Sequence, residues 1–393
     1  MTRSGPLEGL LVIDLTRVLA GPFATMVLAD MGARVIKVES PETADDAREF
    51  GPFVNGKSAY FMSLNRGKES IALNLKDSGD REIFELLVAK ADVLVENYRP
   101  GTMEKLGYSW ERLQEINPAL VYAAISGFGH TGPYRARAAY DMVVQGMGGI
   151  MSVTGHPGAG PTRVGTSIGD ITAGLFGFGG IVSALYDRTR TGKGAMVDVG
   201  MLDCQVAILE NAIGRYLADG AVPQPLGARH PSITPFEAFP TKDDHIIVAA
   251  GNRALFEKLC EALGRPELLD DPDFTTNDLR TTNHDRLKSE LVKTLQTRSA
   301  AEWLKIIGDA GVPCGPINNV AQVVNDPHVN ARNMIIRTDD PEAGKVRMAG
   351  NPIKITGFED PSERAPAPRL DRDREAVLEL IGLTGGSRGA AAR

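Results

Sequence analysis

Short apolar segments alternate with longer amphipathic stretches over the first 130 residues of the chain. Each apolar segment is rich in Val, Ile, Leu and Ala and only a few residues long, which is typical of a buried strand. We expect helices after residue 20 and over about 78–91. We expect strands at residues 10–15, 34–39, 70–75, 92–97 and 119–126. Strands separated by helices in this way predict βαβ units and a parallel sheet.

Two more helices are expected in the middle of the chain. One covers about 139–151, and the other follows Asp170 with the sequence "ITAGLFGFGGIVSALYDR". The small residues of the second helix indicate that another backbone passes very close to it. Both helices are therefore expected to be buried. After them, "GKGAMVDVGMLDCQVAIL" predicts a strand that leads directly into a helix.

The composition changes near residues 218–240, where the Pro- and Gly-containing stretch "DGAVPQPLGARHPSITPFEAFP" is typical of a linker. One strand at 245–251 and several helices follow. From about residue 331 the strand-like pieces "NMIIRT", "KVRMAG" and "PIKITG" precede a helix near 371–382. We therefore expect a large α/β domain interrupted by a smaller one. The predicted segments are 1–217 (large domain, first part), 218–330 (small domain with linkers), 331–384 (return to the large domain) and 385–393 (disordered tail).

The composition is that of an ordinary globular protein of 393 residues, with 42% apolar and 24% charged positions. The net charge of −7 argues against a nucleic acid or an anionic membrane as partner, because either requires a basic face. The longest uncharged apolar stretch, 171–186, is shorter than the roughly 20 residues of a membrane span. We predict a cytoplasmic protein with no membrane partner.

Metal and thiol chemistry have little support in the sequence. Neither H-x-x-x-H nor C-x-x-C occurs, so we expect no metal site. Cys204, Cys260 and Cys314 are far apart and lie in apolar surroundings. We interpret them as structural free thiols in a reducing compartment.

A G-x-G-x-x-G pattern occurs in "ISGFGHTGPY", at Gly127, Gly129 and Gly132. In a dinucleotide-binding turn the third glycine opens a helix, and an acidic residue follows about 20 residues later. Here Pro133 follows the third glycine, and residues 142–169 contain no acid. These two departures from the fingerprint argue against NAD binding.

The stretch "PTRVGTSIGDITAGLFGFGG" places one carboxylate, Asp170, between glycines and an uncharged helix. One interpretation is a helix N-cap, because an Asp before an apolar helix accepts backbone N–H bonds. Another is a nucleophile, since a carboxylate with an ordinary pKa near 3.9 is ionised at neutral pH and needs no base. Both interpretations can hold for the same residue.

Seven ordered motifs carry a resemblance to a known family: "DLTRVLAGPFATMVLADMGARVIKVE", "NRGKESIALNLK", "DVLVENYRPGTMEKLG", "ISGFGHTGP", "RAAYD", "SIGDITAGL" and "AGVPCGPINN". The sequence resembles the class III coenzyme A transferases, the formyl-CoA transferase family, up to about residue 360. It is most similar to the branch that handles dicarboxylates such as succinate, glutarate and hydroxymethylglutarate. The resemblance implies an α/β fold, with a Rossmann-like parallel sheet in the large domain and a smaller α/β domain. It also implies an interlocked homodimer.

By this resemblance Asp170 corresponds to the catalytic aspartate, which forms acyl anhydride and CoA thioester intermediates. Coenzyme A is then a substrate, together with a carboxylic acid, and no cofactor is bound permanently. Gly251 and Asn252 resemble the family's mobile glycine loop. His230 is either a residue over the substrate carboxylate or an ordinary loop histidine. The CoA-contacting positions implied by the resemblance are Val18, Leu19, Leu73, Asn74, Leu75, Lys76, Asn97, Tyr98, Arg99, Lys105, Arg137 and Tyr140.

Departures from the family pattern refine these expectations. Formyl-CoA transferases carry a glutamine where this chain has Leu19, which argues against a pocket sized for formate or oxalate. We expect succinyl-CoA or a related C4–C6 dicarboxyl-CoA as donor. An α-methylacyl-CoA racemase is the alternative enzyme, but this chain has Tyr140 where racemases carry a histidine, and His130 and His156 do not match that position. A nonenzymatic CoA-binding role is the third alternative, against which the intact Asp170 argues.

Overall fold

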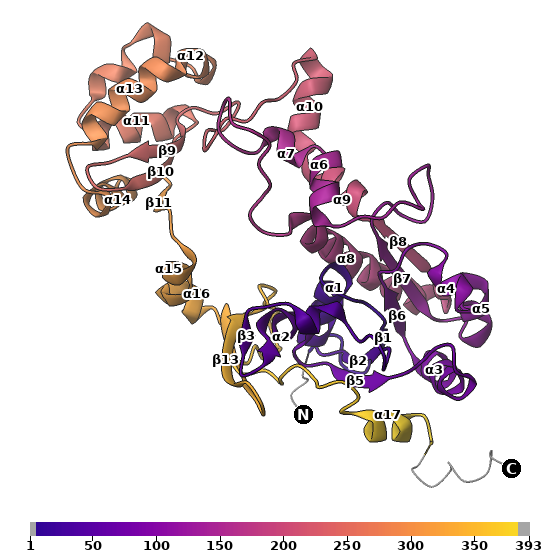
Figure 1. The fold of residues 1–393 in the computed structure, drawn as a ribbon. Helices are drawn as coiled ribbons and strands as arrows, with labels where there is room; N and C mark the ends of the chain where they lie inside the picture. Colours follow the sequence, from indigo (N-terminus) through magenta and orange to yellow (C-terminus); the bar gives the residue numbers. More distant parts are fainter. Residues whose placement is uncertain (1–4, 384–393) are drawn as a thin grey trace, which may run out of the picture. The chain divides into compact units, whose positions relative to one another are not determined.

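A six-stranded parallel sheet forms the centre of the first of two units into which the chain divides. The structure is a computed structural model and describes residues 5–383 (Figure 1). The first unit comprises residues 5–151, Arg163–Gly220 and 327–383. The second comprises Ser152–Thr162 and Ala221–Asp326. The predicted segments 1–217, 218–330 and 331–384 stay a prediction, and the predicted tail at 385–393 lies outside the described residues.

The strand order of the large sheet is β5-β2-β1-β6-β7-β8, and every neighbouring pair is parallel. The strands are β1 (Leu11–Asp14), β2 (Arg34–Glu39), β5 (Glu69–Ala72), β6 (Val93–Glu96), β7 (Val121–Ser126) and β8 (Met196–Gly200). The predicted parallel sheet is therefore confirmed. In register, Val12 of β1 lies opposite Val35 of β2 and Val93 of β6. The chain reverses its direction of travel across the sheet between β1 and β6, and such a point leaves a crevice at the carboxyl ends of the strands.

Helices cover both faces of this sheet because its strands are apolar on both sides. Val12, Val95 and Ile125 belong to the core beneath one face, while Ile13 and Leu94 belong to the other. The first face is covered by α1 (Ala20–Asp30), α8 (Ile168–Thr191) and α9 (Met201–Ile208). The second face is covered by α3 (Ser78–Lys90), α4 (Thr102–Lys105), α5 (Trp110–Ile116) and α17 (Arg374–Leu380).

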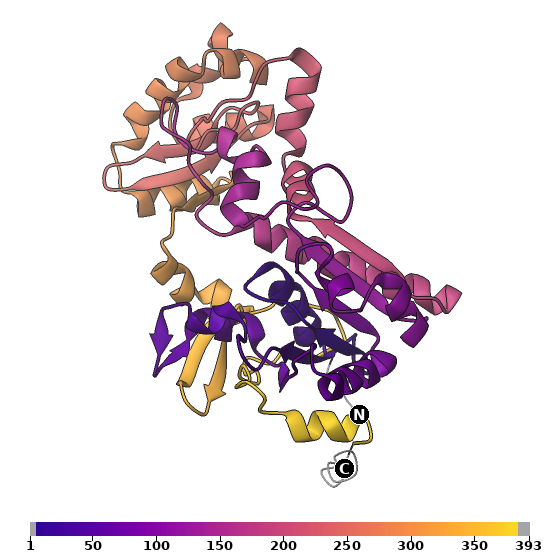
Figure 2. The ribbon, with the colours of Figure 1, turned by 45° about the vertical axis from the view of Figure 1, so that its right-hand side comes forward.

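Two hairpins join distant parts of the first unit. The short strands β3 (Phe53–Val54) and β4 (Lys57–Ser58) precede α2 (Ala59–Asn65). Phe61 and Met62 of α2 pack against Ala343, which lies between β12 (Ile335–Asp340) and β13 (Gly344–Ala349). Figure 2 shows the orange hairpin beside the purple α2 segment. The hairpin at 53–58 was not predicted, and the apolar piece at 352–357 forms no strand.

The expected helix at 139–151 is two short helices, α6 (Asp141–Met147) and α7 (Ile150–Val153). Gly149, with a φ of 88°, lies between them. The expectation that α6 and α8 are buried is only partly correct. Met142 on α6 and Leu175 and Phe176 on α8 are exposed, so each helix keeps one apolar face in solvent within the single chain.

Helix α8 spans 24 residues and is long and apolar enough to cross a membrane by length and composition. This corrects the expectation that no segment reaches that length. The same test is passed by core helices of globular proteins, and α8 contributes Ala173, Ile181 and Leu185 to the core against the sheet. Its residues pack against α1, β7 and β8. We therefore interpret α8 as a core helix of the first unit.

The second unit contains a three-stranded antiparallel sheet in the order β11-β10-β9. Its strands are β9 (Phe236–Pro240), β10 (His245–Ala249) and β11 (Cys314–Pro316). Only β10 was predicted, and β9 had been assigned to the linker. Glu237 occupies a core-facing position of β9, bonded to His284 at 2.5 Å and to Lys288. Because a carboxylate occupies this buried position, the sequence lacks the alternation of apolar and polar residues by which a strand is predicted.

Helices complete the second unit and enclose a core that includes Phe239, Phe256 and Trp303. They are α11 (Arg253–Ala262), α12 (Asn277–Thr282), α13 (His284–Leu295), α14 (Ala300–Asp309) and α15 (Val320–Asn325). The remaining helices, α10 (Glu210–Asp219) and α16 (Pro327–Ala331), belong to the first unit.

Candidate active site

The carboxyl ends of β1, β6 and β7 open onto a cavity of about 270 Å³ in the first unit. Its wall includes the turn after β1, the turn after β6, the glycine-containing loop after β7, and Asp170 from α8. We call it the Asp170 cavity. It lies where the strand order reverses, which is where open α/β sheets bind their ligands.

Asp170 is the third residue of α8, whose N-cap is Ser167. The interpretation of Asp170 as the N-cap is therefore wrong, although its place in the first turn still suits the helix dipole. Residues 5–383 supply no hydrogen bond or ion pair to its carboxylate. Burial, and then the nearby carboxylate of Asp141, raise the pKa of Asp170 from 3.8 to about 7. The site thus contains an unpaired carboxylate that titrates near neutrality.

Asp141, in the first turn of α6, anchors the start of α8. Its Oδ1 accepts a hydrogen bond from Gly169 N at 2.8 Å, and its Oδ2 accepts one from Gln145 Nε2 at 2.7 Å. A Cβ at position 169 would lie 2.7 Å from Val144 Cγ2 and 3.0 Å from Asp141 Oδ1, so any larger residue there would displace these side chains. Sequence reasoning did not single out Asp141. The available signal was an acid at the start of a short apolar helix.

Glycines on the buried side of α8 bring this helix against its neighbours, as predicted. A Cβ on Gly174 would lie 2.7 Å from the carbonyl oxygen of Ala20, and one on Gly177 would lie 2.6 Å from Ile125 Cδ1. Real Cβ atoms do not approach so closely without displacing their neighbours. The glycines therefore set the depth at which α8 lies on the sheet, and with it the position of Asp170.

Glu96, the last residue of β6, fixes the turn that follows it. Its Oε2 accepts a hydrogen bond from Tyr98 N at 2.5 Å, and its Oε1 accepts one from the Tyr122 hydroxyl at 2.9 Å. Burial raises the pKa of Glu96 to about 7, against these hydrogen bonds, which favour its ionised form. The turn is also joined to the one after β1, because Asn97 Oδ1 accepts from Arg17 N and Asn97 Nδ2 donates to Arg17 O.

The fold brings most of the predicted CoA-contacting residues to this cavity. Those that line it are Val18, Leu19, Asn97, Tyr98, Arg99, Arg137 and Tyr140. Two arginines that sequence reasoning missed, Arg17 and Arg135, line it as well. Arg17 pairs with Asp46 at 2.8 Å, while the Arg137 guanidinium lies over the ring of Tyr134 at 4.8 Å.

A second cavity, of about 350 Å³, adjoins the first and shares Arg17 and Tyr98 with it. We call it the Lys76 cavity. The other predicted residues that line it are Leu73, Asn74, Leu75 and Lys76. Lys105 lines neither cavity, although Thr102 and Leu106 on either side of it line the second. The two cavities thus share part of their lining, with Lys76 in the wall of one and Asp170 in the wall of the other.

Tyr60 of α2 was not predicted as a site residue. Burial, and then the charges of Asp170, Asp45 and Asp141, raise the pKa of Tyr60 to about 12. Its hydroxyl is therefore neutral over the physiological range and can only act as a hydrogen-bonding group there.

The predicted substrate-loop residues His230, Gly251 and Asn252 belong to the second unit. Asn252 is the N-cap of α11 and accepts a hydrogen bond from Leu255 N at 2.8 Å. A Cβ on Gly251 would lie 1.9 Å from Ile233 Cγ2, so a larger residue there would displace the Ile233 side chain. Nδ1 of His230 accepts a hydrogen bond from Ser232 N. Their role toward the substrate stays a prediction.

The loop after β7 does not form a dinucleotide-binding turn. No helix begins between Gly127 and Tyr140, and α6 starts only at Asp141. The racemase arrangement is not present at this cavity either. His130 does not line it, since its backbone N–H donates to Asp198 and its Nε2 lies 3.7 Å from Glu96 Oε1.

The cysteines were expected to be structural thiols rather than reactive ones. Burial raises the pKa of Cys204 and Cys260 to about 12, so neither forms a thiolate near neutral pH. All three cysteines are free thiols. Over residues 5–383, no group of three or more His, Cys, Asp or Glu side chains is arranged to hold a metal ion.

Comparison with known proteins agrees with this geometry. The family described as CoA-transferase family III matches residues 7–374. The chain is 52% identical over 374 residues to the acetyl-CoA:oxalate CoA-transferase of Acetobacter aceti, covering 95% of each chain. It is 42% identical to the succinyl-CoA:glutarate CoA-transferase of Mus musculus, covering 96% of this chain and 86% of the relative.

A solved structure shows the same fold. The crystal structure of a CAIB/BAIF family protein from Brucella suis superposes with a TM-score of 0.84 at 41% identity. The match covers 96% of this chain and 100% of the other. The chain therefore belongs to CoA-transferase family III and is a class III acyl-CoA:carboxylate CoA-transferase.

Proposed function

We propose that this enzyme transfers CoA through covalent intermediates on Asp170. The observation that carries the proposal is the unpaired, largely buried carboxylate in the wall of a cavity at the reversal point of the sheet. A carboxylate without hydrogen bonds or counter-ions is poorly stabilised, and it is therefore a better nucleophile than a solvated one. Its pKa near 7 leaves a large ionised fraction at neutral pH.

The proposed reaction has four displacements. An Asp170 oxygen attacks the thioester carbonyl of the donor, the C–S bond breaks, and CoA leaves as a thiolate. The thiolate then attacks the aspartyl carbonyl of the resulting anhydride, which releases the donor acid. The acceptor carboxylate attacks this aspartyl thioester and expels CoA again. Attack of the thiolate on the acceptor side of the second anhydride forms the new acyl-CoA and restores Asp170.

CoA is proposed to occupy both cavities, with its thioester end at Asp170. The predicted contacts divide between the two walls, and Lys76, Arg99 and Arg137 supply positive charge along them. Guanidinium and ammonium groups are the usual partners of phosphate oxygens. Lys105 lines neither cavity, and we retain it only as a neighbour of the second. CoA is a substrate in this scheme, and no permanently bound cofactor is proposed.

The acid substrate is proposed to be a small dicarboxylate. The relatives named above act, by their names, on acetyl-CoA and oxalate and on succinyl-CoA and glutarate. Arg17 and Arg135 also line the Asp170 cavity and can receive a second carboxylate. Succinyl-CoA or a related dicarboxyl-CoA remains our proposed donor. We no longer infer from Leu19 that oxalate is excluded, since a 52% identical relative has oxalate in its name.

The assembly proposed from the family resemblance is an interlocked homodimer in the cytoplasm. The exposed apolar side chains Leu175, Phe176 and Tyr186 of α8 are consistent with a partner chain on that face. In the same scheme, the Gly251–Asn252 loop covers the aspartyl intermediate, and His230 lies near the substrate carboxylate.

A screen of donor and acceptor pairs tests the proposal. Acetyl-, succinyl-, glutaryl- and formyl-CoA are incubated separately with oxalate, succinate and glutarate, and new thioesters are measured by chromatography. Wild-type enzyme should exchange CoA with at least one dicarboxylate, and hydroxylamine or borohydride should trap an adduct at Asp170. Asp170→Asn should bind CoA without exchange. Substantial exchange by that variant would remove Asp170 from the mechanism.

A further inference from the structure

The turn between β1 and α1 forms part of the wall of the Asp170 cavity, through Val18, Leu19 and Ala20. The segment "LTRVL" that makes this turn contains no glycine. Val18 nevertheless has a φ of 66°, in the left-handed region. For a β-branched residue this conformation costs on the order of 1–3 kcal/mol and persists only where its surroundings enforce it.

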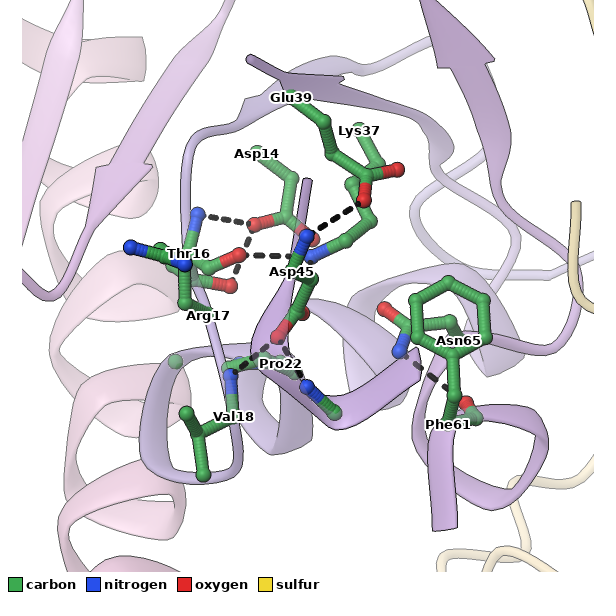
Figure 3. Close-up of polar contacts among 12 residues, drawn as sticks. Asp14, Thr16, Arg17, Val18, Pro22, Lys37, Glu39, Asp45, Phe61 and Asn65 are labelled. Atoms are coloured by element: carbon green, nitrogen blue, oxygen red, sulfur yellow. Dashed lines mark hydrogen bonds and ion pairs between the residues drawn. The ribbon is translucent and has the colours of Figure 1, made fainter. Parts of the chain in front are cut away.

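The buried side chains of Asp14 and Lys37 and the half-buried side chain of Asn97 hold the peptide groups that precede Val18. Thr16 N donates to Asp14 Oδ1 at 2.8 Å, and Lys37 Nζ donates to Thr16 O at 2.6 Å. Arg17 N donates to Asn97 Oδ1 at 2.8 Å, and Asn97 Nδ2 donates to Arg17 O at 2.7 Å. Figure 3 shows the Asp14 and Lys37 side chains converging on this turn.

Val18 itself is held by Asp45. Val18 N donates to Asp45 Oδ1 at 3.0 Å, and Ala47 N donates to the same oxygen at 3.0 Å (Figure 3). The other oxygen, Oδ2, lies 2.9 Å from Lys37 Nζ, and both side chains of this ion pair are fully buried. Burial acts to raise the pKa of Asp45, but the Lys37 ammonium and the two N–H groups outweigh it and keep the pKa below its usual value. Asp45 is thus a charged acceptor aimed at the strained peptide.

The position of this turn determines the position of the cavity wall relative to Asp170. Helix α1 begins directly after the turn, at Ala20, and packs along α8. The contact is tightest one helical turn beyond Asp170, where Gly174 meets the carbonyl of Ala20. We propose that Asp45, with Lys37 as its counter-ion, is a positioning residue for CoA transfer: it holds Val18 left-handed and so sets the wall that faces Asp170. This inference rests on the proposed function of the cavity.

A purely structural role is the competing explanation, because removing one partner of a buried ion pair destabilises a protein by several kcal/mol wherever it lies. The first unit contains a matched control in Asp340 and Lys57. Asp340 Oδ1 also accepts two backbone N–H bonds, each at 3.0 Å, and its Oδ2 pairs with Lys57. Neither residue lines the Asp170 cavity or the Lys76 cavity.

The test compares two double variants, Lys37→Met with Asp45→Asn and Lys37→Met with Asp45→Ala. Both lack the buried charges, so neither leaves an unpaired ion. They differ in the acceptor offered to Val18, because Asn retains an oxygen at Oδ1 and Ala does not. The full-length enzyme is measured for Tm, for CoA affinity, and for kcat and KM with the best donor and acceptor pair. The same Asn and Ala changes are made at Asp340 with Lys57→Met.

Both variants at position 45 lose the Lys37 hydrogen bond to Thr16 O, so only the comparison between them isolates the acceptor offered to Val18. The kcat/KM of the Ala variant should be about 10- to 100-fold lower than that of the Asn variant, the effect expected from displacing a reacting geometry by about 1 Å. The Asp340 pair should change Tm without that loss. Equal kcat/KM for the two variants at position 45, or an equal loss in the Asp340 controls, would overturn the proposal. Exchange that survives in Asp170→Asn would instead refute the proposed function, so the two failures are distinguishable.

Discussion

Replacing the proposed nucleophile should make the protein more stable as well as inactive. The pKa of Asp170 is raised from 3.8 to about 7, first by burial and then by Asp141. A carboxyl whose folded pKa lies above its unfolded pKa stabilises the fold fully only below the unfolded value, and this stability is lost as the pH rises through the folded value. Asp170 therefore weakens the fold progressively between about pH 4 and pH 7. Asp170→Asn removes the titration and keeps the shape of the side chain.

The magnitude follows from the size of the pKa shift. Each unit corresponds to about 1.4 kcal/mol, so three units set an upper bound of about 4 kcal/mol above pH 7. Asp170 is partly accessible to solvent, which screens the charge, and we expect about 2 kcal/mol. The sign of the change in the free energy of unfolding is a more decisive test than its size, because most substitutions destabilise a protein, whereas replacing a catalytic group commonly stabilises it.

This effect is measured by calorimetry of the full-length enzyme between pH 5 and pH 8.5, as the Tm at which the first unit unfolds. The Tm difference between Asp170→Asn and wild type should grow with pH up to about 7 and then level off. Asp187→Asn is the control, since Asp187 is an exposed residue of the same helix and its replacement changes the net charge equally. The reasoning would be refuted by a variant that is less stable than wild type at pH 8, or by a Tm difference that does not depend on pH.

Three further predictions concern the site and its supports. The kcat/KM should decrease as the pH falls below about 7, because the proposed nucleophile must be ionised. Asp141→Asn should move this decrease to lower pH, because it removes a neighbouring negative charge. A kcat/KM independent of pH between 5.5 and 8 would contradict both predictions. Gly174→Ala should lower Tm by several degrees and reduce exchange, because its Cβ would meet a backbone carbonyl; an unchanged Tm would contradict this reasoning. Lys76→Ala should raise the KM for the acyl-CoA and make that KM less dependent on ionic strength. Lys105→Ala should change neither the KM nor its dependence on ionic strength, because Lys105 does not line the cavity.

Much of the first unit could be predicted because its strands are buried on both faces. The segment 34–39 is an uninterrupted strand in the sequence and in the structure alike. The helix expected over about 78–91 is also present, as α3, which begins beside the capping residue Asp77. The second unit was harder, because β9 carries the buried Glu237 and β11 is three residues long. Local periodicity cannot identify strands whose existence depends on partners distant in the chain.

The candidate site divides in the same way. The isolation of Asp170 among small and uncharged residues was visible in the sequence, and the ordered motifs predicted the family. Its unpaired state and raised pKa were not visible, because both depend on how the folded chain surrounds it. The pKa is raised first by burial and then by Asp141, which is 29 positions away in the sequence and adjacent in space. A lysine inside the apolar strand 34–39 was the only sign of the Lys37–Asp45 pair.

The amino-acid sequence by itself determined the alternation of strands and helices, the close packing of α8 through its glycines, and the placement of one carboxylate, Asp170, among small and uncharged residues. These are properties of local spacing and of side-chain size, which act over a few residues. Only the tertiary structure decided that the turns after β1, β6 and β7 meet at one cavity with Asp170 in its wall. It also decided that Val18 is held in a left-handed conformation by Asp45. Burial and electrostatic fields are sums over all neighbours in space, so they exist only once the chain has folded.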